Sequence, residues 1–167
     1  MAGSEKVGMD AARENLYEGA CVLVTPEETV QEETADVVRQ IWESVGASVT
    51  LMSPSMHDQL IARTSHLPHM MAALLVEAVD RDDSSVFPFC GPGFRDTTRI
   101  AAGSEQVWHD IVKSNAIAIR DELSVLRDGI DELCALIDRE AFDEIRDFLA
   151  VCRKKREGFR DRGQSGE

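Results

Sequence analysis

Two histidines and a serine lie close together in the segment Ser65-His66-Leu67-Pro68-His69. If this segment is helical, His66 and His69 are three residues apart and can face one ligand. Imidazoles can donate or accept hydrogen bonds, transfer protons or bind a metal. Pro68 removes one backbone donor between them, so the helix should kink or leave a polar group unpaired here. Such a break of local rules is typical of a functional site.

Spacing alone leaves the role of these histidines open. A histidine on a helix is more often a core or surface residue than a ligand. His-x-x-His spacing could also indicate a metal, but no Asp, Glu or Cys lies at a helical step that would complete the site. We therefore expect no metal site.

A helix from Ser55 to Val79 is predicted to carry the segment. Ser55 is a candidate N-cap, and Asp58 can close a capping box. An apolar stripe then continues at steps of four and three. Its members are Leu60, Thr64, Leu67, Met71, Leu74 and Ala78.

The chain before this helix reads as strand, helix and strand. Apolar runs predict strands at Ala20–Val24 and Ala47–Met52. The helix between them is expected to begin at Thr25-Pro26-Glu27-Glu28 and to end at Gly46. Two strands joined by a crossover helix are normally neighbours in a parallel sheet with more strands.

The chain after this helix is predicted to be helical almost to its end. Residues 81–94 read as a loop, and Asp96 or Thr97 can cap a helix that carries Arg99. Trp108 lies in a helix that opens after Gly103-Ser104 and is expected to pack in the core. Two further apolar stripes predict helices over residues 112–126 and 130–152.

Composition excludes several classes of function. The chain has 167 residues, of which 43% are hydrophobic and 29% charged, as in soluble globular proteins. Its net charge of -13 provides no basic footprint for nucleic acid. We see no signal peptide and no apolar run long enough to span a membrane. The four scattered cysteines form no Cys-x-x-Cys pair and favour free thiols in the cytoplasm.

Three motifs in order resemble one enzyme family. They are the opening Met-Ala-Gly-Ser-Glu-Lys at residues 1–6, the Ser-His-Leu-Pro-His segment, and Gly-Pro-Gly-Phe-Arg-Asp-Thr-Thr-Arg-Ile-Ala at residues 91–101. Together they resemble the prephenate/arogenate dehydrogenases of tyrosine biosynthesis.

The resemblance implies a mainly α fold, in which an all-helical dimerisation domain follows a strand-helix-strand remnant of an α/β nucleotide-binding domain. We expect the remnant at residues 1–54, the helical dimerisation and substrate domain at 55–158, and a disordered tail at 159–167. The helical domain would form a homodimer.

The activity implied by the resemblance is an NAD(P)-dependent oxidoreductase reaction. Prephenate loses a hydride and carbon dioxide to give 4-hydroxyphenylpyruvate, or arogenate gives tyrosine. The sequence decides neither between NAD and NADP nor between the two substrates, because cofactor selectivity belongs to the nucleotide-binding domain.

The family match identifies substrate-binding residues. Arg99 would clamp a substrate carboxylate, because a guanidinium presents a planar bidentate face. His69 would donate to a substrate oxygen, and His66 and Ser65 would shape the same wall.

The resemblance at the opening motif implies which residues border the active site, and it implies that the catalytic histidine lies outside this chain. Ser4, Glu5 and Lys6 match residues beside the family's substrate and cofactor site. The histidine expected to bond the ring hydroxyl would lie two positions before Met1, and the Gly-x-Gly-x-x-Gly loop would lie further upstream. We therefore expect no catalytic residue in this chain, no cofactor binding by the chain alone, and an inactive fragment that begins at an internal methionine.

Two alternatives stay open. The chain could be a non-catalytic helical binding or dimerisation module that retains only the substrate wall. Residues 126–133 also distantly resemble the helix opening of chorismate mutases, although charged amphipathic helices produce such strings easily.

Overall fold

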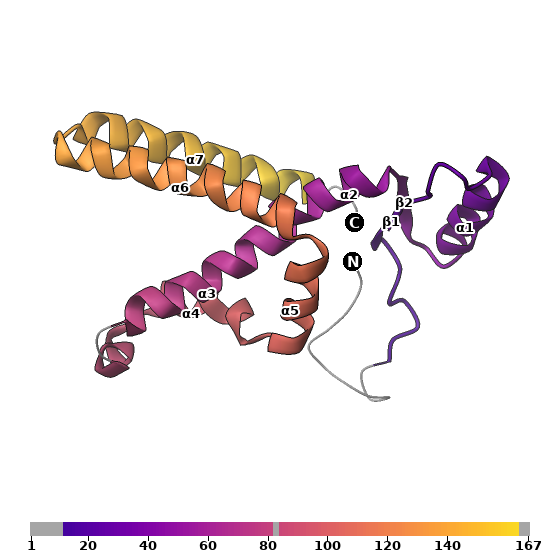
Figure 1. The fold of residues 1–167 in the computed structure, drawn as a ribbon, viewed down its shortest axis with the longest axis horizontal. Helices are drawn as coiled ribbons and strands as arrows, with labels where there is room; N and C mark the ends of the chain where they lie inside the picture. The colour runs from indigo at the N-terminus through magenta and orange to yellow at the C-terminus, as the bar shows by residue number, and fades with distance from the viewer. Residues whose placement is uncertain (1–11, 82–83, 164–167) are drawn as a thin grey trace. The chain divides into compact units, whose positions relative to one another are not determined.

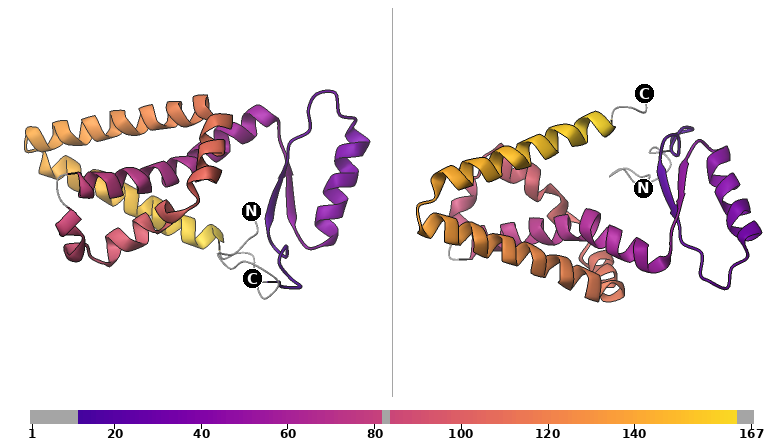
Figure 2. Two further views of the ribbon diagram at one scale, coloured as in Figure 1. Left: turned by 60° about the horizontal axis from the view of Figure 1, so that its bottom comes forward. Right: turned by 90° about the horizontal axis from the view of Figure 1, so that it is seen from above.

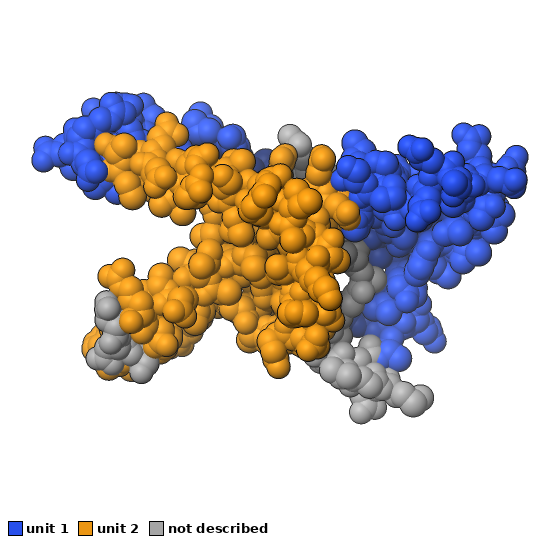
Figure 3. Space-filling model, viewed as in Figure 1, with its two compact units in different colours: residues 1–57, 136–167 blue, residues 58–135 orange. Residues whose placement is uncertain are grey.

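The computed structural model describes residues 12–81 and 84–163. Apart from two short strands, its regular elements are helices (Figure 1). The chain divides into two compact units, residues 1–57 with 136–167 and residues 58–135 (Figure 3). No helix in the described part is both long enough and apolar enough to cross a membrane. The predicted fold class, a helical domain after a strand-helix-strand piece, is confirmed.

In the first unit, strands β1 (Cys21–Val24) and β2 (Ser48–Leu51) form a parallel pair. Cys21 lies opposite Ser48 and Val24 opposite Leu51. Helix α1 (Glu32–Ser44) makes the crossover and lies along the strands (Figure 2). Both strands agree with the sequence prediction to within a residue at each end.

The predicted start of α1 was wrong. The helix begins at Glu32 with Gln31 at its N-cap, not at Thr25. The backbone N–H of Val30 instead donates to the carbonyl of Glu27 at 2.9 Å and closes a turn after β1. A capping signal marks where a helix can begin, whereas packing decides where it does begin. Here the buried Ala35, within the first turn of α1, belongs to the small core of this unit.

The central helical segment consists of α2 (Pro54–Ile61), the π-helical turn η2 (Ala62–His66) and α3 (Leu67–Asp80). The predicted helix is present, but its cap is not Ser55. The backbone N–H of Met56 donates to the Ser53 hydroxyl at 3.2 Å, so Ser53 caps the first turn.

The second unit continues with short helices. The 3₁₀ turn η3 (Ser84–Phe89) is followed by α4 (Pro92–Thr98), η4 (Arg99–Ala102) and α5 (Glu105–Ser114). Gly91 is the N-cap of α4 and Pro92 its first residue, so neither Asp96 nor Thr97 caps this helix as predicted. Arg99 begins a separate 3₁₀ turn.

The last two helices are α6 (Ala116–Asp138) and α7 (Phe142–Gly163). The two downstream apolar stripes each run across a helix boundary that their periodicity did not reveal. Asn115 separates α5 from α6, and a turn around Glu140 separates α6 from α7. Glu140 has a φ of 55°, a left-handed conformation that reverses the chain.

The core of the second unit is small and built mainly from small side chains. Ala62, Ala72 and Ile119 are its buried apolar residues, and His69 and Thr98 are buried polar residues beside them. Among the described residues, many large apolar side chains of α6 and α7 remain exposed, including Ile117, Val125, Phe142 and Phe148. Exposure on this scale is typical of a surface that another chain covers.

Candidate functional site

The π-helical turn gives the Pro68 region its geometry. The backbone N–H of Leu67 donates to the carbonyl of Ala62, five residues back, and not to the residue four back as in an α-helix. The Thr64 hydroxyl donates to the Leu60 carbonyl at 2.8 Å. The helix therefore meets the proline with a widened turn, and the predicted disturbance near Pro68 is confirmed.

His69 is, with Thr98, one of the buried polar residues described in the second unit, and 7% of its surface is exposed. Its imidazole stacks on the indole of Trp108, with ring centroids 3.4 Å apart and planes 15° apart. Burial lowers the pKa of His69 below its ordinary value, because the charged form loses water. At neutral pH this side chain is thus an uncharged hydrogen-bonding group.

His66 contacts the same indole from another direction. Its ring is edge-on to Trp108, with centroids 6.0 Å apart and an interplanar angle of 88°. The Asn115 amide nitrogen donates to the Asp58 carbonyl at 2.8 Å and lies 3.4 Å from Nδ1 of His66. Because the Asp58 carbonyl only accepts, the amide orientation is fixed, and Nδ1 of His66 is the acceptor.

The remaining predicted residues fall into two groups. Ser65 is half-buried in the π-helical turn that also contains His66, and Arg99 is exposed at the start of η4. Since η4 packs against α3, the element that carries Arg99 lies beside the helix that carries His69. Ser4, Glu5 and Lys6 lie outside the described residues.

Sequence reasoning missed the supporting residues Asn115 and Gly103. Asn115 falls in the break between α5 and α6, and its side chain links Asp58 of α2 to His66 at the end of η2. Gly103 approaches both Trp108 and His69. The one available signal was the Gly103-Ser104 pair, which we interpreted only as the opening of the next helix. Ser104 does cap α5, accepting from the Val107 N–H.

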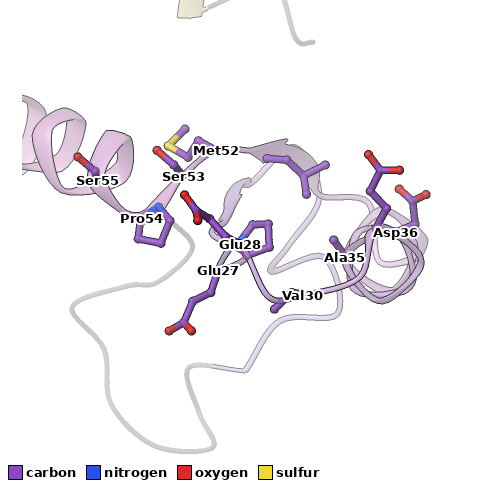
Figure 4. A pocket seen from close by; sticks show the side chains of 12 residues that line it. Glu27, Glu28, Val30, Ala35, Asp36, Met52, Ser53, Pro54 and Ser55 are labelled. Atoms are coloured by element: carbon purple, nitrogen blue, oxygen red, sulfur yellow. The ribbon is translucent and has the colours of Figure 1, made fainter.

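A separate cleft lies in the first unit at the carboxyl ends of β1 and β2. Its volume is about 980 Å³, and it is bounded by the loop after β1, the start of α1 and the residues after β2 (Figure 4). Ligands of α/β sheets often bind at such ends. The described lining residues include four carboxylates and no Lys or Arg, so this cleft disfavours phosphates and dicarboxylates. The carboxylates belong to Glu27, Glu28, Glu32 and Asp36.

The described residues provide no complete site for a dinucleotide or a metal. The pair Gly91 and Gly93 lies at the start of α4 after a 3₁₀ turn, without the preceding strand that a dinucleotide loop requires. No group of three or more potential metal ligands occurs within 12–81 and 84–163. Because the described residues lack a glycine-rich turn between a strand and a helix, they do not by themselves form a binding site for a nicotinamide cofactor.

Two family models together match most of the chain. One, described as the dimerization domain of prephenate dehydrogenase, matches residues 53–151. The other, described as the nucleotide-binding domain of prephenate dehydrogenase, matches residues 1–51.

Curated relatives are similar over much of this chain. Prephenate dehydrogenase of Bacillus subtilis is 31% identical over 163 residues, which cover 95% of this chain and 44% of that protein. Cyclohexadienyl dehydrogenase of Zymomonas mobilis is 33% identical over 123 residues, which cover 71% of this chain and 42% of that protein. The chain thus spans less than half the length of these relatives.

Solved structures share the fold. Prephenate dehydrogenase from Aquifex aeolicus, crystallised with hydroxyphenyl propionate and NAD+, superposes with a TM-score of 0.86 at 34% identity, over 95% of this chain and 57% of that one. Synechocystis arogenate dehydrogenase gives a TM-score of 0.83 at 30% identity, over 95% and 59% of the two chains. The motifs, the fold and these matches agree, and the chain belongs to the prephenate dehydrogenase family.

Proposed function

We propose that this chain supplies the substrate-binding wall of an NAD(P)-dependent dehydrogenase that oxidatively decarboxylates prephenate to 4-hydroxyphenylpyruvate, or arogenate to tyrosine, in tyrosine biosynthesis. The observation that carries the proposal is the buried His69 stacked on Trp108, on a helix against which the Arg99 turn packs. Such an arrangement offers one cationic and one neutral donor on a single wall.

The two donors would have different tasks. Prephenate is a compact dianion, and the net charge of -13 would repel it unless a local cation compensates. Arg99 would bind a carboxylate through its planar fork. His69 would donate a hydrogen bond to a second substrate oxygen without adding charge, and Ser65 and His66 would limit the space beside it.

NAD or NADP would be the cofactor of the whole protein. Because the described residues do not form a dinucleotide cradle, we expect the chain alone to bind neither cofactor and to have no dehydrogenase activity. We retain the domain division between residues 54 and 55 as part of this proposal, whereas α7 continues to Gly163, past the expected start of the tail at residue 159. Ser4, Glu5 and Lys6 would border the site.

We also propose that the helical domain forms a homodimer. The matched family model is that of a dimerization domain, and the exposed apolar residues of α6 and α7 provide surface for a second copy. A second candidate function is a non-catalytic binding or dimerisation module. It is favoured by the presence of the histidine wall without a dinucleotide loop among the described residues.

The first experiment compares two preparations. Native protein is recovered from its source cells with an antibody against α7, and the 167-residue chain is expressed alone. We expect NAD(P) reduction with prephenate or arogenate from the native protein and none from the chain. Native protein that turns over neither substrate but binds them would favour the non-catalytic module, and turnover by the chain alone would contradict its assignment as an inactive fragment.

The second experiment measures binding of prephenate to the chain by calorimetry. Arg99→Lys should weaken binding about tenfold or more, which corresponds to about 1.4 kcal/mol, because an ammonium cannot replace the bidentate fork. The matched control is Arg95→Lys, one helical turn earlier and also exposed. Equal affinities of the two variants would contradict the role of Arg99.

A further inference from the structure

Gly103 lies where a side chain would collide with the site. A Cβ atom at this position would lie 2.9 Å from Nε1 of Trp108 and 3.1 Å from Cε1 of His69. The first distance is shorter than van der Waals contact allows, so the indole would have to move. The backbone of Gly103 therefore passes close to both rings at the point where they stack.

The same glycine ends the turn that carries Arg99. Its backbone N–H donates to the carbonyl of Ile100 at 3.2 Å, immediately after η4. Its close approach thus places the residue that ends η4 beside the His69 ring. Trp108 is the fourth residue of α5, four residues after the Ser104 cap, so a short, capped connection joins it to Gly103.

We propose that Gly103 and Trp108 form a clamp that positions the His69 imidazole for its hydrogen bond to the substrate. The inference rests on the proposed function of His69. Trp108 covers one face of the imidazole, and the absence of a Cβ at residue 103 allows the indole to reach it. Both are positioning residues, because they act through His69.

The clamp also accounts for the charge state of His69. A flat indole 3.4 Å from the imidazole excludes water from that face, and desolvation by burial is the cause that lowers the pKa of His69. Phenylalanine can preserve a flat cover at residue 108, whereas leucine cannot. The flat shape of the side chain at residue 108, and not its apolar character alone, should therefore determine how far the pKa of His69 is lowered.

The test is a pH titration of the His69 imidazole by NMR in the 167-residue chain. In Trp108→Leu, we expect the pKa of His69 to rise toward the ordinary value and the ring-current shift of its protons to be lost. Trp108→Phe should largely retain both the lowered pKa of His69 and the ring-current shift. A folded Trp108→Leu variant with an unchanged His69 pKa and unchanged shifts would overturn the proposal.

Gly103→Ala provides a second route that retains the indole. It should displace the stack and change the His69 imidazole shifts. The matched control is Gly129→Ala on α6, where an added Cβ would meet nothing within 4 Å and should leave His69 unchanged. If Trp108→Leu fails to fold, unchanged His69 shifts in Gly103→Ala overturn the clamp.

These measurements need no turnover, so they separate the clamp from the proposed function. Loss of His69 positioning in the Trp108 variants would stand even if prephenate does not bind. Conversely, His69→Gln should abolish prephenate binding if the proposed function is right, whatever the state of the clamp. Trp108→Leu should then weaken prephenate binding in the same direction, and Trp108→Phe should restore it.

Discussion

Asn115 holds His66 as a hydrogen-bond acceptor, with its amide nitrogen 3.4 Å from Nδ1 of the imidazole and 2.8 Å from the Asp58 carbonyl. Nδ1 therefore provides the lone pair in this contact, which favours the tautomer of His66 with its proton on Nε2.

Removal of the Asn115 amide should destabilise the chain and allow His66 to adopt either tautomer. We expect Asn115→Ala to lower the free energy of unfolding by about 1 kcal/mol, because two acceptors lose a donor. Urea denaturation measures the loss, and imidazole nitrogen shifts report the tautomer. Ser114→Ala is the control, since its hydroxyl donates to the carbonyl of Ile111, three residues earlier in the same helix. A tautomer that is unchanged in Asn115→Ala would contradict this prediction.

Removing Arg63 and removing Glu122 from their ion pair should destabilise the chain by different amounts. Nε and Nη2 of Arg63 donate to one oxygen of Glu122 at 3.0 and 2.8 Å, and the side chains are 71% and 15% exposed. Arg63→Ala leaves a shielded carboxylate without that partner, whereas Glu122→Gln leaves a guanidinium that water can solvate. We expect Arg63→Ala to lower the unfolding midpoint more, and the reverse order would refute the asymmetry.

Stability should depend on pH through His69. Above about pH 6.5, the ordinary histidine pKa, the side chain is neutral in both the folded and unfolded states. Below it the unfolded chain takes up a proton that the folded protein resists, because burial lowers the folded pKa. The free energy of unfolding should fall as the pH decreases through this window.

His69→Gln isolates this contribution. The loss of stability between about pH 7.5 and about pH 5.5 should be smaller in the variant than in the unsubstituted chain. Denaturant titrations at both pH values measure the difference. A pH dependence identical in the two proteins would show that His69 does not carry it.

Two residues with positive φ should respond in opposite directions to substitution. Glu140 has a φ of 55° in the turn after α6, where the Ala141 N–H donates to the Leu136 carbonyl at 2.9 Å. Glycine suits this position better, so Glu140→Gly should stabilise the chain by about 1 kcal/mol. Thermal unfolding measures the gain, and a lower melting temperature would argue against relief of backbone strain.

Gly46→Ala should destabilise the chain. Its φ is 86°, and an added Cβ would lie 3.2 Å from Cα of Glu18. Gly19→Ala is the matched control, with a φ of 67° and nothing within 4 Å of the added Cβ. Both substitutions should lower the free energy of unfolding by about 1–2 kcal/mol, because alanine disfavours the left-handed conformation. Only Gly46→Ala adds a close contact with Glu18 to this loss. Equal losses of stability in Gly46→Ala and Gly19→Ala would show that the contact with Glu18 has no measurable cost.

The sequence predicted those parts of the fold that depend on local pattern. The two strands are short apolar runs, and the disturbance at Pro68 follows from a missing N–H, so both could be found without tertiary information. The break at Asn115 and the turn at Glu140 were missed because the apolar periods of neighbouring helices happen to continue across them.

The site was predicted only in part for a similar reason. His66 and His69 stand out by type and spacing, and both contact Trp108. The roles of Gly103 and Asn115 depend on contacts with residues far away in the sequence, such as His69, which lies 34 positions before Gly103. No spacing rule reveals such contacts, because chain folding and not periodicity brings these residues together.

The π-helical turn before Pro68 accommodates one residue more than an α-helical turn would. Because the Leu67 N–H bonds to the Ala62 carbonyl five residues back, deleting one residue from Ala62–His66 would place the same two groups four residues apart, as in a regular α-helix. Asp58 would then still face Asn115, and His69 would keep its stack on Trp108. Lengthening this turn by one more residue, with no second π-turn to accommodate it, would instead turn α2 and α3 out of register.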